Sequence, residues 1–376
     1  MVRGGRGMSA CAACLRRSHL IGHLAPRIAS LLDRPRRRPA GLMSLGEAEL
    51  IDAVAGPRAA EAWRFLERFD AQAAGERIEA GGLGALCVHA RAYPGKLRDL
   101  VDPPAVLYLT GEEERLAELA AEPAVAIVGA RRASPYGLEM AHAMGRGLSA
   151  ARVTVVSGLA LGVDAAAHRG ALEGGSSVLA VVAGGADIPY PKRNRRLYAR
   201  IREEGAVLSE SPPGQRPLRW SFPARNRLMA GLADLTLVVE AASPSGSLIT
   251  AEFAQDLGRT LAAVPGRATS RTAAGTNSLL RDGAALVTGS EDVLEELFGV
   301  GHAHSVEPPA PAEDLPPDLA SVLEAVESEA TVDGMARASE LRVGAVRAAL
   351  ARLEASGHIR RVGLAAYERT TLVTSD

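Results

Sequence analysis

The chain has 376 residues, of which 47% are apolar, and its 43 basic residues nearly balance 44 acidic ones. This length predicts two or three domains with a substantial buried core. The near-zero net charge excludes nucleic-acid binding through overall charge, so any basic surface must be local. No stretch reaches the roughly 18 apolar residues of a membrane span, so no membrane association is expected.

The first 42 residues carry nine arginines and a single acidic residue, Asp33. They lack the apolar core of a secretory signal. The composition therefore predicts a disordered, arginine-rich extension over residues 1–42, and Met43 opens the first regular segment. Cys11 and Cys14 form a C-x-x-C pair, but the chain has only one further cysteine, so the spacing predicts no metal site. Three cysteines fit a reducing, cytoplasmic location without disulfides.

Residues 43–111 show helical patterns followed by a short apolar strand at 106–109. This segment is expected to be a small helical, SAM-like domain with a connecting strand. Residues 301–317 are rich in proline and predict a linker. Residues 318–376 combine a three-helix pattern with a hairpin about Gly363, which predicts a winged-helix domain.

Residues 112–300 alternate short apolar strands with amphipathic helices. The strands are expected at 125–129, 153–156, 178–183, 206–208, 235–240, 261–264 and 285–287. Continuous apolar strands between helices are typical of a parallel sheet that is buried on both faces. The fold class is therefore α/β, with an extended Rossmann-like domain between the helical and winged-helix domains. Its ligands should bind at the carboxyl ends of the strands.

Several turns at this sheet edge could hold an anion. Arg131 follows the first strand, and its guanidinium suits a phosphate, although the G-x-G-x-x-G fingerprint of dinucleotide binding is missing. Ser157 and Gly158 follow the second strand. Asp164 and His168 stand four positions apart at the next helix start, where we expect structural roles rather than catalysis.

Two basic segments that lack acidic residues, 192–202 and 216–227, lead into helices at the same edge. They contain Lys192, Arg225 and Arg227, together with aromatic residues. Basic side chains follow a phosphate backbone and aromatic faces stack on bases, so the segments favour single-stranded nucleic acid over a merely solvated helix face.

The turn Ser245-Gly246-Ser247 could supply hydroxyl and N–H donors at a helix start, or simply cap that helix. No Walker A motif, nucleophile elbow or H-E-x-x-H motif is present. We therefore expect no catalytic residue, no cofactor and no metal, and a protein that is not an enzyme.

Taken together, these segments resemble the DprA/Smf family, the DNA-processing proteins of natural transformation. Seven stretches match in order between residues 93 and 297: Ile127-Val128-Gly129-Ala130-Arg131, Ser157-Gly158-Leu159-Ala160-Leu161-Gly162-Val163-Asp164 with Ala167-His168, Tyr190-Pro191, Phe222-Pro223-Ala224-Arg225-Asn226-Arg227, Val239-Glu240-Ala241, Ser245-Gly246-Ser247-Leu248-Ile249-Thr250-Ala251 and Val264-Pro265-Gly266.

The resemblance implies an extended Rossmann fold, a homodimer joined through that domain, and binding and protection of incoming single-stranded DNA. It also implies loading of the RecA recombinase during transformation and recombination. By resemblance, the phosphates would be contacted by Arg131, Lys192, Arg225 and Arg227. The site would be shaped by Asn226 and by the turns Ser157-Gly158 and Ser245-Gly246-Ser247.

Two other functions remain open from the sequence. Related Rossmann-like folds bind nucleotides, so the domain could be a nucleotide-binding enzyme or sensor. The winged helix could make the protein a transcription regulator, because such helices read the major groove of DNA. The expected recognition helix carries Arg342, Arg347 and Arg352, and the expected wing carries Arg360 and Arg361.

Overall fold

The computed structural model describes residues 10–32, 40–111, 113–175, 177–299, 315–329, 331–355, 358–361 and 367–369. The chain divides into two compact units, Met1–His302 and Ala303–Asp376, and each is described by itself. No helix among the described residues combines the length and the apolar character that crossing a membrane requires.

The first unit is built on a nine-stranded sheet in the order β1-β2-β6-β5-β4-β3-β7-β8-β9. The strands are β1 (Leu83–Cys87), β2 (Val106–Thr110), β3 (Ala124–Val128), β4 (Thr154–Ser157), β5 (Val178–Val181), β6 (Ala206–Ser209), β7 (Leu235–Val238), β8 (Thr260–Ala263) and β9 (Ala285–Leu286). The strands from β3 to β9 are parallel, as predicted, and β1 and β2 add an antiparallel edge. Because β2 pairs with β6, the sheet extends into the segment expected to be a separate helical domain.

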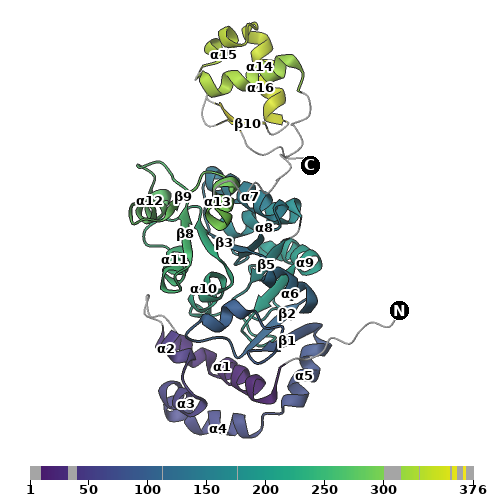
Figure 1. Ribbon diagram of the computed structural model, residues 1–376, viewed down its shortest axis with the longest axis vertical. Helices are drawn as coiled ribbons and strands as arrows, with labels where there is room; N and C mark the ends of the chain where they lie inside the picture. Colours follow the sequence, from purple (N-terminus) through teal and green to yellow (C-terminus); the bar gives the residue numbers. More distant parts are fainter. Residues whose placement is uncertain are drawn as a thin grey trace, which may run out of the picture. The chain divides into compact units, whose positions relative to one another are not determined.

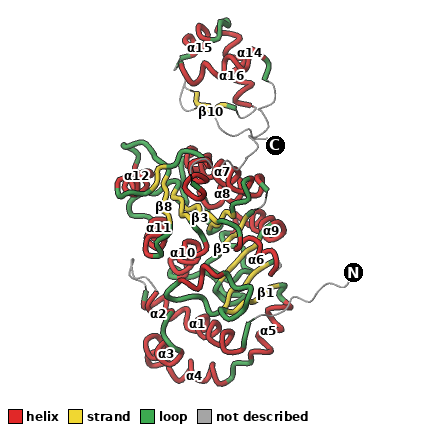
Figure 2. Tube along the Cα trace, in the orientation of Figure 1, coloured by secondary structure: helices red, strands yellow, loops and turns green. Residues whose placement is uncertain are grey.

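Helices cover both faces of this sheet (Figures 1 and 2). One face carries α7 (Pro135–Ala150), α8 (Val163–Gly174), α9 (Arg195–Glu204) and α13 (Ser290–Phe298). The other carries α6 (Glu113–Ala121), α10 (Ser221–Leu232) and α11 (Gly246–Asp256), and α12 (Ala274–Arg281) packs beside β8. Two covered faces explain why the strands have continuous apolar sequences instead of alternating ones.

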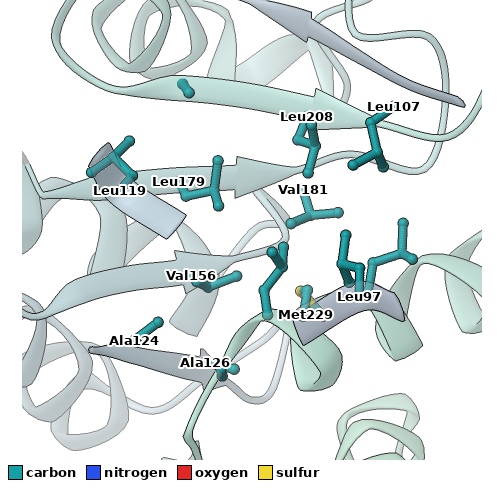
Figure 3. Close-up of a cluster of buried hydrophobic side chains, with 14 of the residues drawn as sticks. Leu97, Leu107, Leu119, Ala124, Ala126, Val156, Leu179, Val181, Leu208 and Met229 are labelled. Atoms are coloured by element: carbon teal, nitrogen blue, oxygen red, sulfur yellow. The ribbon is translucent and has the colours of Figure 1, made fainter. Parts of the chain in front are cut away.

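The core on the α10 side joins side chains of neighbouring strands to helix side chains. Val156, Leu179 and Val181 are buried together with Leu97 and Met229, as Figure 3 shows. Met229 lies two turns into α10, so this packing fixes the position of the start of α10 at the carboxyl edge of the sheet.

The N-terminal helices are α1 (Ala12–Leu31), α2 (Ala40–Met43), α3 (Glu47–Ala55), α4 (Ala59–Glu67) and α5 (Ala71–Ala80). Helix α1 lies in the segment expected to be disordered, so that expectation is wrong for residues 12–31. Its Leu20, Leu24 and Ile28 are buried among residues of α3 and α4. The hydroxyl of Tyr108 on β2 donates to Oγ of Ser18 at 2.9 Å.

The arginine-rich composition of residues 1–42 suggests disorder and does not indicate this helix. The buried residues of α1 recur at helical spacing, but arginines and histidines stand between them. Of the rest of the expected extension, residues 1–9 and 33–39 lie outside the described residues.

The described residues of the second unit form three helices and two antiparallel strands, as predicted. They are α14 (Pro317–Ser328), α15 (Val332–Ala338), α16 (Val343–Ala355), β10 (Ile359–Arg361) and β11 (Tyr367–Arg369). The unit has its own apolar core, which includes Val322, Val346 and Leu353. The hairpin turn at Gly363 and most of the expected linker lie outside the described residues.

Candidate nucleic-acid interface

A cavity of about 430 Å³ opens at the carboxyl edge of the sheet. It lies where the strand order reverses between β3 and β7, the place where open α/β sheets bind ligands. The cavity is lined by Val128, Gly129, Arg131, Ala160, Asp164, Phe222, Pro223, Arg225, Asn226, Met229, Ser245, Gly246, Ser247, Ile249 and Thr250. The structure therefore brings together most of the residues that the sequence singled out.

Arg131 forms part of an exposed rim with two aromatic rings. Its Cζ atom lies 5.0 Å from the ring centre of Phe222, in a cation–π arrangement. The ring of Tyr190 lies 5.9 Å from that of Phe222, and Tyr190 is 46% exposed. A permanent positive charge thus lies over the ring of Phe222, which in turn lies beside Tyr190.

Arg225 is buried at the base of the cavity. Its Nη1 donates to the carbonyl oxygen of Gly158 at 2.7 Å and to that of Val181. Burial lowers the pKa of Arg225 to about 10, while Asp164 opposes this shift, so the guanidinium is charged at neutral pH. The carbonyls at the ends of β4 and β5 therefore hold a cation beneath the cavity.

Asp164, in the first turn of α8, organises the loop between β4 and α8. Its Oδ2 accepts hydrogen bonds from the N–H groups of Gly158, at 3.1 Å, and Ala160, at 3.3 Å. Burial raises the pKa of Asp164, and the charge of Arg225 opposes that shift. The charged residues that line the cavity are two arginines and Asp164. When Asp164 is ionised, the lining therefore has a net charge of one positive unit.

His168 and Ser157 are fully buried and do not line the cavity. Burial lowers the pKa of His168 to about 3, so its ring is neutral. The hydroxyl of Ser157 donates to the carbonyl oxygen of Ile127 at 2.6 Å and joins β4 to β3. Ser157 is fully buried, so its hydroxyl is positioned to support the sheet edge, not to reach a ligand.

The start of α11 forms a further part of the cavity lining. Ser245 is its N-cap, and Oγ of Ser245 accepts the N–H of Ser247 at 3.3 Å. Asn226 Nδ2 donates to the carbonyl oxygen of Gly246 at 3.2 Å, which joins α10 to this turn. A methyl group on Gly246 would meet no atom within 4 Å, so the turn faces open space.

The start of α7, in contrast, is already occupied by an acidic side chain of the protein. Oε2 of Glu240 accepts the N–H of Ser134 at 2.7 Å, and Ser134 Oγ caps the helix through the N–H of Gly137. An anion is therefore not expected where a dinucleotide pyrophosphate sits in other Rossmann-like domains. Local sequence patterns do not indicate this contact, because Glu240 is 106 positions from Ser134.

Arg227 is not part of the cavity. Its guanidinium is 2% exposed, with Nε 2.9 Å from Asp102 Oδ1 and Nη2 2.7 Å from Glu210 Oε2. With two carboxylates as partners, it is a buried structural cation. The expectation that Arg227 contacts a phosphate is therefore wrong.

Lys192 also lies outside the lining residues, but near them. It is exposed in a short 3₁₀ helix, Lys192–Asn194, two positions after Tyr190. Nδ2 of Asn194 donates to the carbonyl oxygens of Leu159, at 2.8 Å, and Ala160, at 3.1 Å. This attachment keeps the basic segment beside the loop that lines the cavity.

An open, mostly parallel sheet with a cationic cavity at its switch point defines a Rossmann-like domain suited to anionic ligands. Residues 84–298 match the family model described as DNA recombination-mediator protein A, and residues 306–363 match the DprA winged helix domain. The chain therefore belongs to the DNA recombination-mediator protein A family, the DprA/Smf family of DNA-processing proteins. This confirms the resemblance and the winged-helix fold of the second unit.

Relatives of known sequence agree with this assignment. The putative DNA processing protein DprA of Mycobacterium tuberculosis strain H37Rv is 44% identical over 258 residues, which cover 68% of this chain and 66% of that protein. The chain thus spans just under two thirds of that relative. DNA processing protein DprA of Streptococcus pneumoniae is 43% identical over 204 residues, 54% of this chain and 71% of the relative.

Two solved structures share the fold. The X-ray structure of DprA from Streptococcus pneumoniae has a TM-score of 0.61 at 32% identity and covers 77% of this chain and 99% of its own. The structure of DNA processing protein A from Helicobacter pylori, solved to describe its single-stranded DNA binding mode, has a TM-score of 0.50 at 33% identity and covers 54% and 92%.

Proposed function

We propose that this protein binds single-stranded DNA at the switch-point cavity and acts as a recombination mediator. One observation carries the proposal: Arg131 and Arg225, from separate elements, line one open cavity whose rim presents two aromatic rings. Guanidinium groups suit phosphates and aromatic faces suit unpaired bases. The Helicobacter pylori relative, described for its single-stranded DNA binding mode, supports the same ligand.

The two arginines have different parts in this proposal. Arg131 is exposed, so its fork can contact a phosphate directly. Arg225 is buried, and its Nη1 is already bonded to two carbonyls, so it supplies a fixed positive field. The Ser245-Gly246-Ser247 turn adds uncharged donors, and Lys192 extends the basic surface along the strand's path.

The residues around the cavity favour binding over catalysis. Among the described residues that line it, no serine or threonine stands beside a histidine that could act as a base. We therefore propose a binding protein without enzymatic activity or a required cofactor. As a mediator it would act in the cytoplasm, as a homodimer joined through the first unit, and would load RecA onto the bound strand.

Fluorescence anisotropy with labelled oligo-dT across a salt series tests the ligand. We expect oligo-dT to bind more tightly than a duplex, with log affinity falling linearly as log salt rises, because each phosphate contact releases counterions. A mononucleotide that competes as well as the oligonucleotide would instead support a nucleotide sensor. A preference for the duplex would support a transcription regulator.

Replacing Arg131 tests the site. Arg131→Ala should weaken oligo-dT binding by about 1–3 kcal/mol at low salt, as for a lost charge-assisted contact. Arg132→Ala is the matched control, because Arg132 is exposed next to Arg131 but does not line the cavity. Equal affinities for the two variants would remove Arg131 from the site.

The mediator role needs its own measurements. Adding this protein should speed RecA assembly on single-stranded DNA, measured by RecA ATPase activity, and Arg131→Ala should reduce that stimulation. Light scattering during size-exclusion chromatography should give the mass of a dimer. If this protein did not change the rate of RecA assembly, the proposed DNA binding would stand but RecA loading would be ruled out.

A further inference from the structure

Three cysteines and a histidine from two distant segments meet at the edge of the sheet. Cys11 and Cys14 stand at the start of α1, Cys87 ends β1, and His89 lies in the following turn. The ligand atoms of the four residues all lie within 4.8 Å of one another. Nδ1 of His89 is 3.7 Å from Sγ of Cys11, 3.5 Å from that of Cys14 and 4.0 Å from that of Cys87.

These distances fit a tetrahedral metal ion. With zinc bonds of about 2.3 Å to sulfur and about 2.0 Å to nitrogen, sulfur and nitrogen ligands stand roughly 3.6 Å apart. The observed separations bracket that value, so a zinc ion needs little rearrangement of these side chains. Three thiolates and one imidazole are also a donor set of structural zinc sites, and soft sulfur ligands disfavour magnesium or calcium.

The local structure of each segment aims its ligands at one point. Cys11 is the N-cap of α1, and Cys14 lies in its first turn, so the C-x-x-C spacing places both thiols at a helix N-terminus. Free N–H groups and the helix dipole favour thiolates at that position. The C-x-x-C pair thus forms half of a preformed site.

The turn after β1 holds the other half. The N–H of Val88 donates to the carbonyl oxygen of Ala105 at 3.1 Å, and the N–H of Ala90 donates to the carbonyl oxygen of Cys87 at 2.8 Å. Nη2 of Arg98 donates to the carbonyl oxygen of Ala90 at 2.8 Å. These bonds fix the backbone on both sides of His89, so its ring is presented to the three sulfurs without a further folding step.

Burial indicates a structural role for a bound ion. Cys14 and Cys87 are buried, whereas Cys11 and His89 are exposed, so an ion could enter from solvent and would then be closed off by four protein ligands. A site with four protein ligands has no open position for a substrate water. The ion would join two segments that are 75 positions apart in the chain.

We propose that Cys11, Cys14, Cys87 and His89 bind one Zn²⁺ ion that fastens the start of helix α1 to edge strand β1. The site is separate from the DNA cavity, and the proposal does not depend on DNA binding. It revises the expectation that the C-x-x-C pair lacks partners. The partners follow a C-x-H spacing far along the chain, so a search for a second C-x-x-C pair could not find them.

Metal analysis of the full chain tests this proposal. Protein expressed in zinc-supplemented medium and purified without chelators should contain about one zinc per chain by plasma mass spectrometry. Cys87→Ser, His89→Ala and the double variant Cys11→Ser/Cys14→Ser should each lose most of that zinc. His142→Asn, on α7, is the matched histidine control and should keep it.

Cobalt substitution gives a second measurement on the wild-type chain, should the variants fail to fold. Zinc-stripped protein titrated with Co²⁺ should develop the strong visible bands of tetrahedral cobalt–thiolate coordination, and added Zn²⁺ should erase them. The proposal is overturned by wild-type protein without bound zinc or cobalt bands, by variants with undiminished zinc, or by a Cys11–Cys14 disulfide in freshly isolated protein.

Discussion

Two arginines on one helix show how position decides the role of a side chain. Arg225 and Arg227 stand two positions apart on α10, and a helix turns about 100° per residue, so they point to nearly opposite sides. Arg225 faces the cavity, whereas Arg227 faces Asp102 and Glu210. Treating the segment as one basic run could not separate them, although the helical period could have done so.

The buried position of Arg227 predicts a loss of stability rather than a loss of DNA contact. Arg227→Met keeps much of the side-chain volume but leaves Asp102, which is 4% exposed, without its cation. Breaking a buried ion pair on one side costs about 3–5 kcal/mol. Urea denaturation should show a decrease of this size in the free energy of unfolding.

A control separates this effect from loss of any surface charge. Arg200→Ala removes an exposed pair with Glu204, four positions on along α9, and such pairs contribute only about 0.3–0.5 kcal/mol. If Arg227→Met kept full stability and lost oligo-dT affinity, the original expectation of a phosphate contact would be restored.

His168 predicts a pH dependence of stability. Burial lowers its pKa to about 3 in the folded protein, below the ordinary value of 6.5 that applies to the unfolded chain. The unfolded chain therefore binds the proton more readily. The stability is complete above about pH 6.5 and falls as the pH drops, by about 1.4 kcal/mol per unit between the two pKa values.

Comparing the wild type with His168→Asn isolates this effect from the other groups that titrate in acid. Between pH 7 and pH 5 the wild type should lose about 2 kcal/mol more of its unfolding free energy than the variant does. Urea denaturation at the two pH values measures this difference. Parallel losses in the two proteins would show that His168 takes up its proton equally in both states.

At the scale of elements, the junction of β4 and α10 depends on one glycine. A Cβ atom at Gly158 would collide with the guanidinium of Arg225 and displace it from the carbonyl of Val181. Gly158→Ala should therefore reduce stability by about 1–3 kcal/mol, as overpacking does, and weaken oligo-dT binding as well.

Gly246→Ala, in the turn at the start of α11 that lines the cavity, is the matched substitution. A methyl group there meets no atom within 4 Å, so stability should change by less than about 0.5 kcal/mol. Thermal denaturation of the two variants checks the contrast. Equal stability of both variants would show that Arg225 is not held against Gly158 in solution.

An element could be predicted from the sequence where a clear local pattern of apolar residues marks its buried face. The parallel strands are continuous apolar runs between turns, so the sequence predicts them to within a few residues. The sequence does not predict helix α1, because arginines interrupt its apolar stripe, or β1, because β1 joins the sheet only by pairing with β2.

The same limit applied to the sites. Turn motifs at the strand ends located the cavity, because parallel strands bring their carboxyl ends to one edge. The partners of Ser134 and of the C-x-x-C pair lie far along the chain, at Glu240 and at Cys87 and His89. Local sequence patterns carry no information on such pairings, since the fold alone brings these residues together.

For the whole molecule, the strand order explains why the cavity belongs to the first unit alone. Strands β4, β5 and β6 lie on one side of β3, and β7, β8 and β9 lie on the other. The reversal creates a crevice at the β3–β7 boundary. All residues that line the cavity lie between Val128 and Thr250, within the first unit.

Deleting residues 303–376 should therefore leave the binding of single-stranded DNA intact. The second unit has its own core, so its removal should not uncover the core of the first. We expect oligo-dT affinity to stay within about threefold, or about 0.6 kcal/mol, of the full chain, with the same salt dependence. Anisotropy titrations of both proteins at several salt concentrations measure this, with Arg131→Ala in the shortened chain as the control. If the deletion abolished all DNA binding, the winged helix would be the DNA-binding element and the cavity would need another ligand.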